Sequence, residues 1–455
     1  MDDRFGRRMP RMMPAWSRGP VAVVVLTLAA TGPLPASAAV AVSSCTVNGI
    51  PVDADEIRGT SGNDVILCPA GLERGDRIEA GAGNDRIEIG GTGVAEYAVV
   101  AGQEGDDVVV VTGAHGSAGS PDGVTANRGL VYTGSGQDTI QLTGGNAYPE
   151  DRRYPGTGGA GNSGRVSDGE DVSITGGTST STTVQAGPGN TGTIEYCVTV
   201  TVSGGAGETP VSQGGLALRG NPGGDANQGD ITATGTVTLT GGTGGRAGSP
   251  YGSGGDGGSA NTGTVRAGTA ILTGGQGANA SENGLGTRGG AANTAAGSVT
   301  AAVVTATGGR GGDGRLRAGN GGDGNKGTIT AADRVSVTGG AGGPATYSDG
   351  QGSGAVGNTG TIITTGPAPV TRIRGGDGGL RDAFTAQGHP GIGNGTTGSV
   401  DGGPGDDSIT AAAGIGTPAS YGRLANEGGI NGGGGINTCT FDGGNQGTVV
   451  NCTIT

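Results

Sequence analysis

The chain has 455 residues, of which 109 are glycine and only 3% are aromatic. This composition excludes a conventional globular core, because most residues carry no large side chain to bury. The formal net charge of −13 disfavours nucleic acid as a partner and favours divalent cations.

The N-terminal segment has the pattern of a secretory signal peptide. Several arginines precede a short apolar run at residues 21–30, and Ala36-Ser37-Ala38 provides small residues at a cleavage site. The apolar run is too short to span a membrane. We therefore predict that residues 1–38 are removed on export, that the mature chain is extracellular and associated with the cell surface, and that it has no transmembrane segment.

Five cysteines in an exported chain predict disulfide bonds. The simplest pairing joins Cys45 to Cys68 near the mature start and Cys439 to Cys452 near the end, and it leaves Cys197 free and facing inward. Such local crosslinks suit segments that cover the exposed edges of a sheet. Sequence alone does not determine the connectivity.

Residues 39–150 contain several Gly-rich segments that each contain an aspartate near their end, and a further copy lies downstream. The segments cover residues 59–66, 81–87, 102–109, 134–140 and 402–409. The aspartates are Asp64, Asp85, Asp107, Asp138 and Asp407, and each is followed two residues later by Ile66, Ile87, Val109, Ile140 or Ile409. A glycine turn leaves backbone carbonyls free, and calcium prefers six to eight oxygen ligands.

These segments resemble the hemolysin-type calcium-binding (RTX) nonapeptide, G-G-x-G-x-D-x-U-x, where U is a large apolar residue. The resemblance implies a parallel β-roll in which turns stack and hold Ca²⁺ through the five aspartates, while the five apolar residues form the core. The first four aspartates are 21, 22 and 31 residues apart, whereas two strict nonapeptides would give eighteen. The alternative is that the carboxylates only decorate turns.

Residues 151–403 form a repeat array with a period near 33 residues. The full pattern is Asn-x-Gly-x-Val/Ile, then a second apolar pair, then Gly-Gly, and it starts at Asn162, Asn190, Asn227 and Asn325. Looser copies start at Asn261, Asn293 and Asn358, and a truncated copy starts at Asn394. The β-branched alternation, as at Val335 and Val337, predicts two short strands per unit. Such repeats bury their apolar faces only by stacking.

Stacking of these units predicts that the asparagines superimpose and hydrogen-bond in a column. The competing interpretation is that Asn-Gly is simply a turn sequence. We expect the Gly-Gly pairs to make sharp corners through positive φ angles. Asp256, Asp313, Asp323 and Asp377 are expected to be solvated residues of long Gly-rich loops, which could also be disordered or form polyproline-like bundles.

Signals for catalysis are sparse. The two histidines lie in Gly-rich loops, and no intact G-x-S-x-G nucleophile motif is present. β-helix enzymes that cut polysaccharides use Asp and Arg, so Arg372, Arg374 and Asp377 keep that alternative open. Threonine rows such as Thr236, Thr238 and Thr240 suggest another alternative, a solenoid that binds ice or a polymer surface.

The sequence therefore predicts an all-β protein, a parallel β-solenoid or β-roll of short strands with long Gly-rich loops. We expect a secreted, non-enzymatic structural or surface-associated protein that binds Ca²⁺, with cell-surface or matrix polysaccharide as a further partner and no nucleic acid. Residues 404–455 are expected to form a C-terminal cap with a disulfide.

Overall fold

The fold was analysed in a computed structural model, which describes residues 44–53, 55–148, 156–180, 184–210, 219–281, 284–346, 350–380, 388–416 and 423–455. The predicted signal peptide, residues 1–38, lies outside the described residues. The chain divides into two units, Met1–Ala41 and Val42–Thr455, and the fold is that of the second unit.

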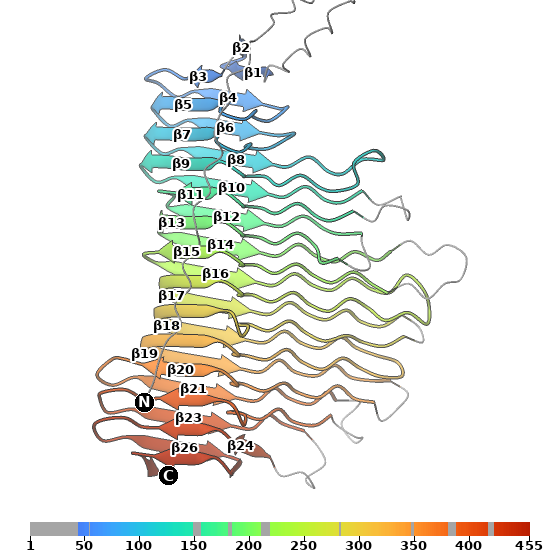
Figure 1. The fold of residues 1–455 in the computed structure, drawn as a ribbon, viewed down its shortest axis with the longest axis vertical. Coiled ribbons are helices and arrows are strands. Elements are labelled where there is room, and N and C mark those ends of the chain that lie inside the picture. The colour runs from blue at the N-terminus through green and yellow to red at the C-terminus, as the bar shows by residue number, and fades with distance from the viewer. Residues whose placement is uncertain are drawn as a thin grey trace, which may run out of the picture. The chain divides into compact units, whose positions relative to one another are not determined.

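The regular secondary structure of the described residues consists of β-strands, and 27 strands belong to one sheet system. Each coil of the chain contributes one strand to each of two stacks, and successive coils pair in parallel (Figure 1). The first stack contains β3 (Glu56–Arg58), β5 (Arg77–Ala82), β7 (Val99–Glu104), β9 (Leu130–Ser135), β11 (Arg165–Ser167), β13 (Thr193–Cys197), β15 (Asp230–Ala233), β20 (Thr361–Thr364), β22 (Ser399–Asp401), β25 (Gly429–Asn431) and β28 (Thr448–Val450).

The second stack contains β4 (Val65–Cys68), β6 (Arg86–Ile89), β8 (Val108–Thr112), β10 (Thr139–Thr143), β12 (Asp171–Thr175), β14 (Thr199–Ser203), β16 (Thr236–Thr240), β21 (Val370–Arg374), β23 (Ser408–Ala412), β26 (Thr438–Asp442) and β29 (Thr453–Ile454). In three coils one long strand runs through both stacks: β17 (Thr264–Thr273), β18 (Ser298–Thr307) and β19 (Thr328–Thr338). The predicted parallel β-solenoid is confirmed.

The core lies between the two stacks because successive side chains point to opposite faces of a strand and the inward-facing ones are mostly apolar, as in β10 and β12. Ile66, Ile87, Val109 and Ile140 are in register on neighbouring strands and are fully buried, as predicted from the repeated turns. Ile409 occupies the same kind of position near the other end and is also buried. Because each coil is thin, its apolar residues are covered only by the coils on either side.

Both predicted disulfides are confirmed. At the N-terminal edge, the hairpin of β1 (Ser44–Val47) and β2 (Ile50–Asp53) lies antiparallel on β4, and Cys45–Cys68 joins the two. At the other end, Cys439–Cys452 joins β26 to the last coil, beside the small sheet of β24 (Leu424–Asn426) and β27 (Gly444–Asn445). Cys197 is free and buried, as expected.

A column of asparagines runs along the corner that precedes the first strand of each coil, which confirms the predicted ladder. Every side-chain amide donates to the amide oxygen of the next asparagine at 2.7–2.9 Å. The column contains Asn127, Asn162, Asn190, Asn227, Asn261, Asn293, Asn325, Asn358, Asn394, Asn426 and Asn445. It is therefore longer at both ends than the array recognised in the sequence. Apolar Leu72 and Val94 occupy this position in the coils before Asn127.

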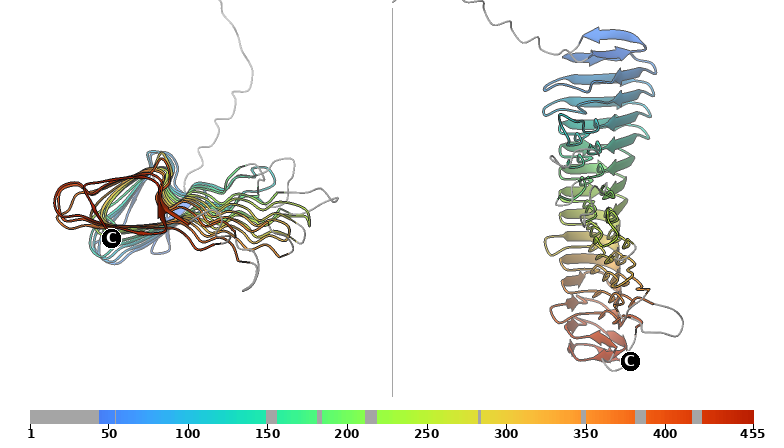
Figure 2. Two further views of the ribbon diagram at one scale, coloured as in Figure 1. Left: turned by 90° about the horizontal axis from the view of Figure 1, so that it is seen from below. Right: turned by 90° about the vertical axis from the view of Figure 1, so that its right-hand side faces the viewer.

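The described parts of the Gly-rich segments between the second strand of each coil and the next ladder asparagine form an ordered layer, which we call the glycine layer. These segments project together from one side of the strand stacks (Figure 2). Their backbones cross-link: Gly242 donates to Gly224, Gly258 to Gly242, and Gly275 to Gly258, at 2.7–2.8 Å. The run Gly-Gly-x, as in residues 254–259, repeats every three residues, which is the period of a polyproline II helix.

The structure shows that the Gly-Gly pairs are needed for a different reason from the one we expected. The Gly-Gly pairs after the second strands, such as Gly241 and Gly242, lack the positive φ angles that we expected. Instead, a Cβ atom on Gly258 would overlap the carbonyl oxygen of Gly224. Glycine is needed because the extended chains pack backbone to backbone, as only glycine fits at the crowded axis of collagen.

Candidate metal-binding turns

Four of the predicted aspartates stack in one column at the corner between the first and second strands. The backbone N–H of Asp64 donates to Oδ1 of Asp85, that of Asp85 to Asp107, and that of Asp107 to Asp138, each at 2.8 Å. Asp138 joins this column despite its 31-residue spacing. The extra residues lie in the glycine layer and leave the turn unchanged.

The aspartate at the end of this column and the aspartates farther along it differ in whether the Oδ2 carboxylate oxygen has a hydrogen-bond partner. At the end, Asp64 receives hydrogen bonds from the Thr60 N–H at 2.5 Å, the Thr60 hydroxyl at 2.9 Å and the Asn48 amide at 2.5 Å. The Oδ2 atoms of Asp85, Asp107 and Asp138 are buried and have no hydrogen-bond partner among the described residues. A buried carboxylate oxygen without a partner is costly in the ionised form.

The pKa values follow this difference. Burial, with the negative charges of Asp85 and Asp138 nearby, raises the pKa of Asp107 to about 7. Burial likewise raises the pKa of Asp85. Burial alone would also raise the pKa of Asp64, but hydrogen bonds from Thr60 and Asn48 outweigh it and lower that pKa. Burial in the column therefore disfavours the ionised forms of Asp85 and Asp107, and a proton or a cation beside these carboxylates would offset that cost.

The turns before these aspartates require unusual backbone angles. Gly81 and Gly83 have positive φ angles, as do Gly134 and Gly136 in another coil. Gln103 lies in register with Gly81 and Gly134, and it has a φ of 88° although it carries a side chain. This is a strained position for a residue other than glycine.

A second ladder lies on the outside of the same turns, one residue before each aspartate. The Asn63 oxygen accepts from the Asn84 N–H at 2.9 Å, Asn84 from Asp106 at 3.0 Å, and Asp106 from Gln137 at 2.9 Å. The sequence interpretation missed this ladder, although the residue before each aspartate is consistently Asn, Asp or Gln. Together the two ladders set the spacing between successive turns.

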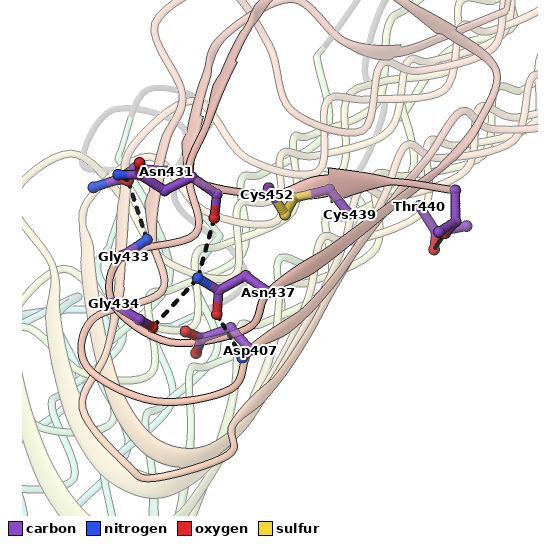
Figure 3. Close-up of a disulfide and its surroundings, with 10 residues drawn as sticks. Asp407, Asn431, Gly433, Gly434, Asn437, Cys439, Thr440 and Cys452 are labelled. Carbon is purple, nitrogen blue, oxygen red and sulfur yellow. Dashed lines mark hydrogen bonds between the residues drawn. A yellow bond between two sulfur atoms is a disulfide. The ribbon is translucent and has the colours of Figure 1, made fainter.

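Asp407 lies at the same corner, many coils farther along, and does not join the first column. Its N–H donates to the side-chain oxygen of Asn437 at 2.8 Å, the same arrangement as between the stacked aspartates. Asn437 also donates to the carbonyls of Gly434 and Asn451, beside the Cys439–Cys452 disulfide (Figure 3). Burial, with Asp401 and Asp406 adding to it, raises the pKa of Asp407 to about 6.

Asn437 belongs to a turn that the sequence interpretation missed. Residues 432–439 read Gly-Gly-Gly-Gly-Ile-Asn-Thr-Cys, which is the nonapeptide pattern with Asn in place of Asp. The missed ladder members Asn127, Asn426 and Asn445 also carried a signal, because each begins the pattern Asn-x-Gly-x followed by an apolar residue.

The first column of aspartates offers oxygen ligands of the type that calcium binds. Carboxylates stacked one coil apart, with buried oxygens that lack partners, offer hard ligands of the kind calcium prefers. Within the described ranges, however, no three His, Cys, Asp or Glu side chains converge on one point. An ion here would take one or two carboxylates and complete its shell with turn carbonyls and water, which is a composition that calcium accepts.

The aspartates of the glycine layer form ion pairs; Asp256, Asp313 and Asp377 remain partly exposed to solvent, as expected, whereas Asp323 does not. Asp256 pairs with Arg219 at 3.0 Å, and Asp313 pairs with Arg310 at 2.6 Å. Asp323 is buried and pairs with Arg288 at 2.8 Å and Lys326 at 3.0 Å, while Asp377 pairs with Arg374. Packing of extended chains side by side brings together the ion pairs formed by Arg219 and by Arg288, whereas the other pairs join residues three apart in the same segment.

No family model matches the sequence, and no curated protein or solved structure is significantly similar to it. The fold itself defines the class: this chain is an all-β, disulfide-linked parallel β-solenoid built from repeats. No helix among the described residues is long and apolar enough to cross a membrane.

Proposed function

We propose that this chain is a secreted structural protein whose stacked aspartate turns bind Ca²⁺, in service of a cell-surface or matrix scaffold. The observation that carries the proposal is the column of Asp85, Asp107 and Asp138, each with a buried oxygen that has no hydrogen-bond partner in the described part of the chain. A cation bound there would neutralise three stacked carboxylates that otherwise repel one another.

Calcium would also link folding to location. Ions that bind only the folded state stabilise it by mass action. The low calcium concentration of the cytosol leaves the carboxylates unneutralised, whereas the higher concentration outside the cell favours the folded stack. The signal-like residues 1–38 and the two disulfides support a role outside the cell.

The test is the effect of calcium on thermal unfolding. We expect the wild-type midpoint to rise as calcium is added after chelation, and this rise to be lost in the double variant Asp85→Asn, Asp107→Asn. Asparagine keeps the Oδ1 acceptor and removes only the charge. Asp106→Asn is the matched control, because it changes the charge of the same turn on its outer side, and it should keep the calcium effect.

An unchanged midpoint in the wild-type protein would reject calcium binding and leave protonation as the way these carboxylates are accommodated. Full retention of the effect in the double variant would reject this column as the site. Among the alternatives, a polysaccharide-cleaving site at Arg372, Arg374 and Asp377 is not favoured by a specific observation, since Arg374 and Asp377 already form an ion pair with each other.

A further inference from the structure

The outward face of the second strand stack carries two columns of hydroxyl side chains, which we call the hydroxyl face. One column consists of Thr112, Thr143, Thr175, Ser203, Thr240, Thr273, Thr307 and Thr338, each paired with the next. The other consists of Ser173, Thr201, Thr238, Thr305 and Ser336, with Ile271 between Thr238 and Thr305. The sheet spaces them by about 4.8 Å between coils and about 6.6 Å along a strand.

Toward the C-terminal end of the stack, both hydroxyl columns reach an arginine at the same strand, β21. Beyond β21 one column continues with Thr410 and Thr440, and the other with Ala412 and Asp442. Arg372 follows Ser336, and Arg374 follows Thr338. Arg334 lies on the neighbouring strand β19 and faces the same side. Arg334 and Arg372 are exposed, and neither forms an ion pair with another residue that the structure describes. Three arginines therefore gather at one end of an otherwise almost uncharged face.

These arginines differ from those of the glycine layer. Arg219 and Arg288 each pair with an aspartate of a neighbouring segment, and Arg310 pairs with Asp313 in its own segment. In a chain with a net charge of −13, carboxylates are plentiful, and Asp333 directly precedes Arg334, yet neither Arg334 nor Arg372 forms an ion pair within the described structure. A guanidinium without an internal partner is available to bind a carboxylate from another molecule in a bidentate manner.

We propose that the hydroxyl face binds an acidic polysaccharide, with sugar hydroxyls along the Thr/Ser columns and uronic-acid carboxylates at Arg334 and Arg372. The distance from one coil to the next is close to the length that one sugar ring adds to an extended chain. A rigid sheet holds these hydroxyls in place before binding, which lowers the entropic cost of recognition. The inference rests on the proposed role outside the cell but does not require calcium.

Other polyanions fit this face less well. Nucleic acid carries a phosphate at every nucleotide, so the strongly negative protein would repel it. An anionic membrane offers no row of hydroxyl groups to match the two columns. A polysaccharide with a carboxylate only on some of its sugars matches a long, mostly neutral face with a small cationic patch near one end.

The test uses the purified chain and compares its binding to hyaluronate, a carboxylated polysaccharide, with binding to neutral dextran, double-stranded DNA and phosphatidylglycerol vesicles. We expect binding to hyaluronate alone, and weaker binding at higher salt. The double variant Arg334→Gln, Arg372→Gln should bind at least tenfold more weakly. The matched control Arg219→Gln, Arg310→Gln removes two paired arginines of the glycine layer and should bind within twofold of wild type.

A second pair of variants tests the hydroxyl columns separately. Thr201→Val with Thr238→Val keeps the side-chain shape and removes the hydroxyls, and it should weaken hyaluronate binding severalfold. Thr264→Val with Thr328→Val on the first strand stack is the matched control.

Two outcomes would overturn the proposal. One is that the arginine variant binds hyaluronate as tightly as wild type, and the other is that wild type binds dextran, DNA or vesicles as tightly as hyaluronate. If the double variant Asp85→Asn, Asp107→Asn loses the calcium effect but still binds hyaluronate, calcium binding and polysaccharide binding are independent, and each proposal can fail without the other.

Discussion

The side-chain amide of Asn227 donates to the amide oxygen of Asn261 at 2.9 Å, while its own oxygen accepts from Asn190 at 2.8 Å. Both residues are fully buried. Each Nδ2 also reaches the backbone carbonyl two residues later, at 3.0 Å for Gly229 and 3.0 Å for Gly263. A single residue type therefore satisfies its own buried polar groups and fixes the register between successive coils.

Replacing Asn261 by alanine should destabilise the protein by about 2–4 kcal/mol, because the Asn227 donor and the Asn293 acceptor each lose a buried partner. Denaturant unfolding would measure this loss. The exposed Gln276, replaced by alanine, is the control and should change stability by less than about 0.5 kcal/mol. A comparable effect of the two substitutions would show that the ladder does not stabilise the stack.

Replacing Gly258 by alanine should disrupt the glycine layer locally. The new methyl group would overlap the Gly224 carbonyl, so the chains must separate, at a cost of about 1–3 kcal/mol. Hydrogen exchange should report faster exchange at Gly242, whose N–H donates to the displaced Gly224 carbonyl, and at Gly275, whose N–H donates to Gly258. Gly119 has open space around it and no positive φ, so Gly119→Ala is expected to leave exchange unchanged.

Replacing Gln103 by glycine should stabilise the protein by about 1 kcal/mol. The substitution relieves the strain of a φ of 88°, which the matching positions Gly81 and Gly134 accommodate without a side chain. Thermal unfolding would measure the gain. Glu104→Gly, at a neighbouring residue of the same strand without positive φ, should instead destabilise. A loss of stability in Gln103→Gly would indicate that the glutamine side chain contributes more than its strain costs.

The pH dependence of stability should reveal the buried column when calcium is chelated. Because the folded protein raises the pKa of Asp107 to about 7, the folded state favours its protonated form. The stability that this group contributes is complete below the unfolded pKa of about 3.9 and is lost as pH rises through about 7. Asp85, with its raised pKa, contributes in the same direction.

Asp107→Asn should therefore lose less stability than wild type between pH 4.5 and pH 8 in the presence of a chelator, as measured by denaturant midpoints. Asp106→Asn should follow the wild-type profile. Identical slopes for wild type and Asp107→Asn would mean that burial does not affect the titration of this carboxyl. The pKa of Asp64 is lowered in the folded protein, so its contribution to stability has the opposite pH dependence. That contribution is lost as the pH falls below about 4.

Local patterns in the sequence determined much of this fold. Alternating β-branched residues such as Val335 and Val337 defined inward faces, the repeated Asn-x-Gly defined one corner, and the Gly-x-Asp turns defined the other. The same patterns predicted both disulfides, because the partners are close in sequence and lie at the two ends. A solenoid favours such inference, since nearly every contact is with the next repeat.

Only the tertiary structure decided what the glycines and charges do. The close approach of Gly258 to Gly224, the pairing of Asp323 with Arg288 and the column from Asp64 to Asp138 join residues in different coils. Which residues meet across coils depends on how many residues each coil places in the glycine layer, and local propensity does not determine that number. Burial of the Asp85 and Asp107 oxygens likewise arises from stacking, because an isolated turn would leave them in water.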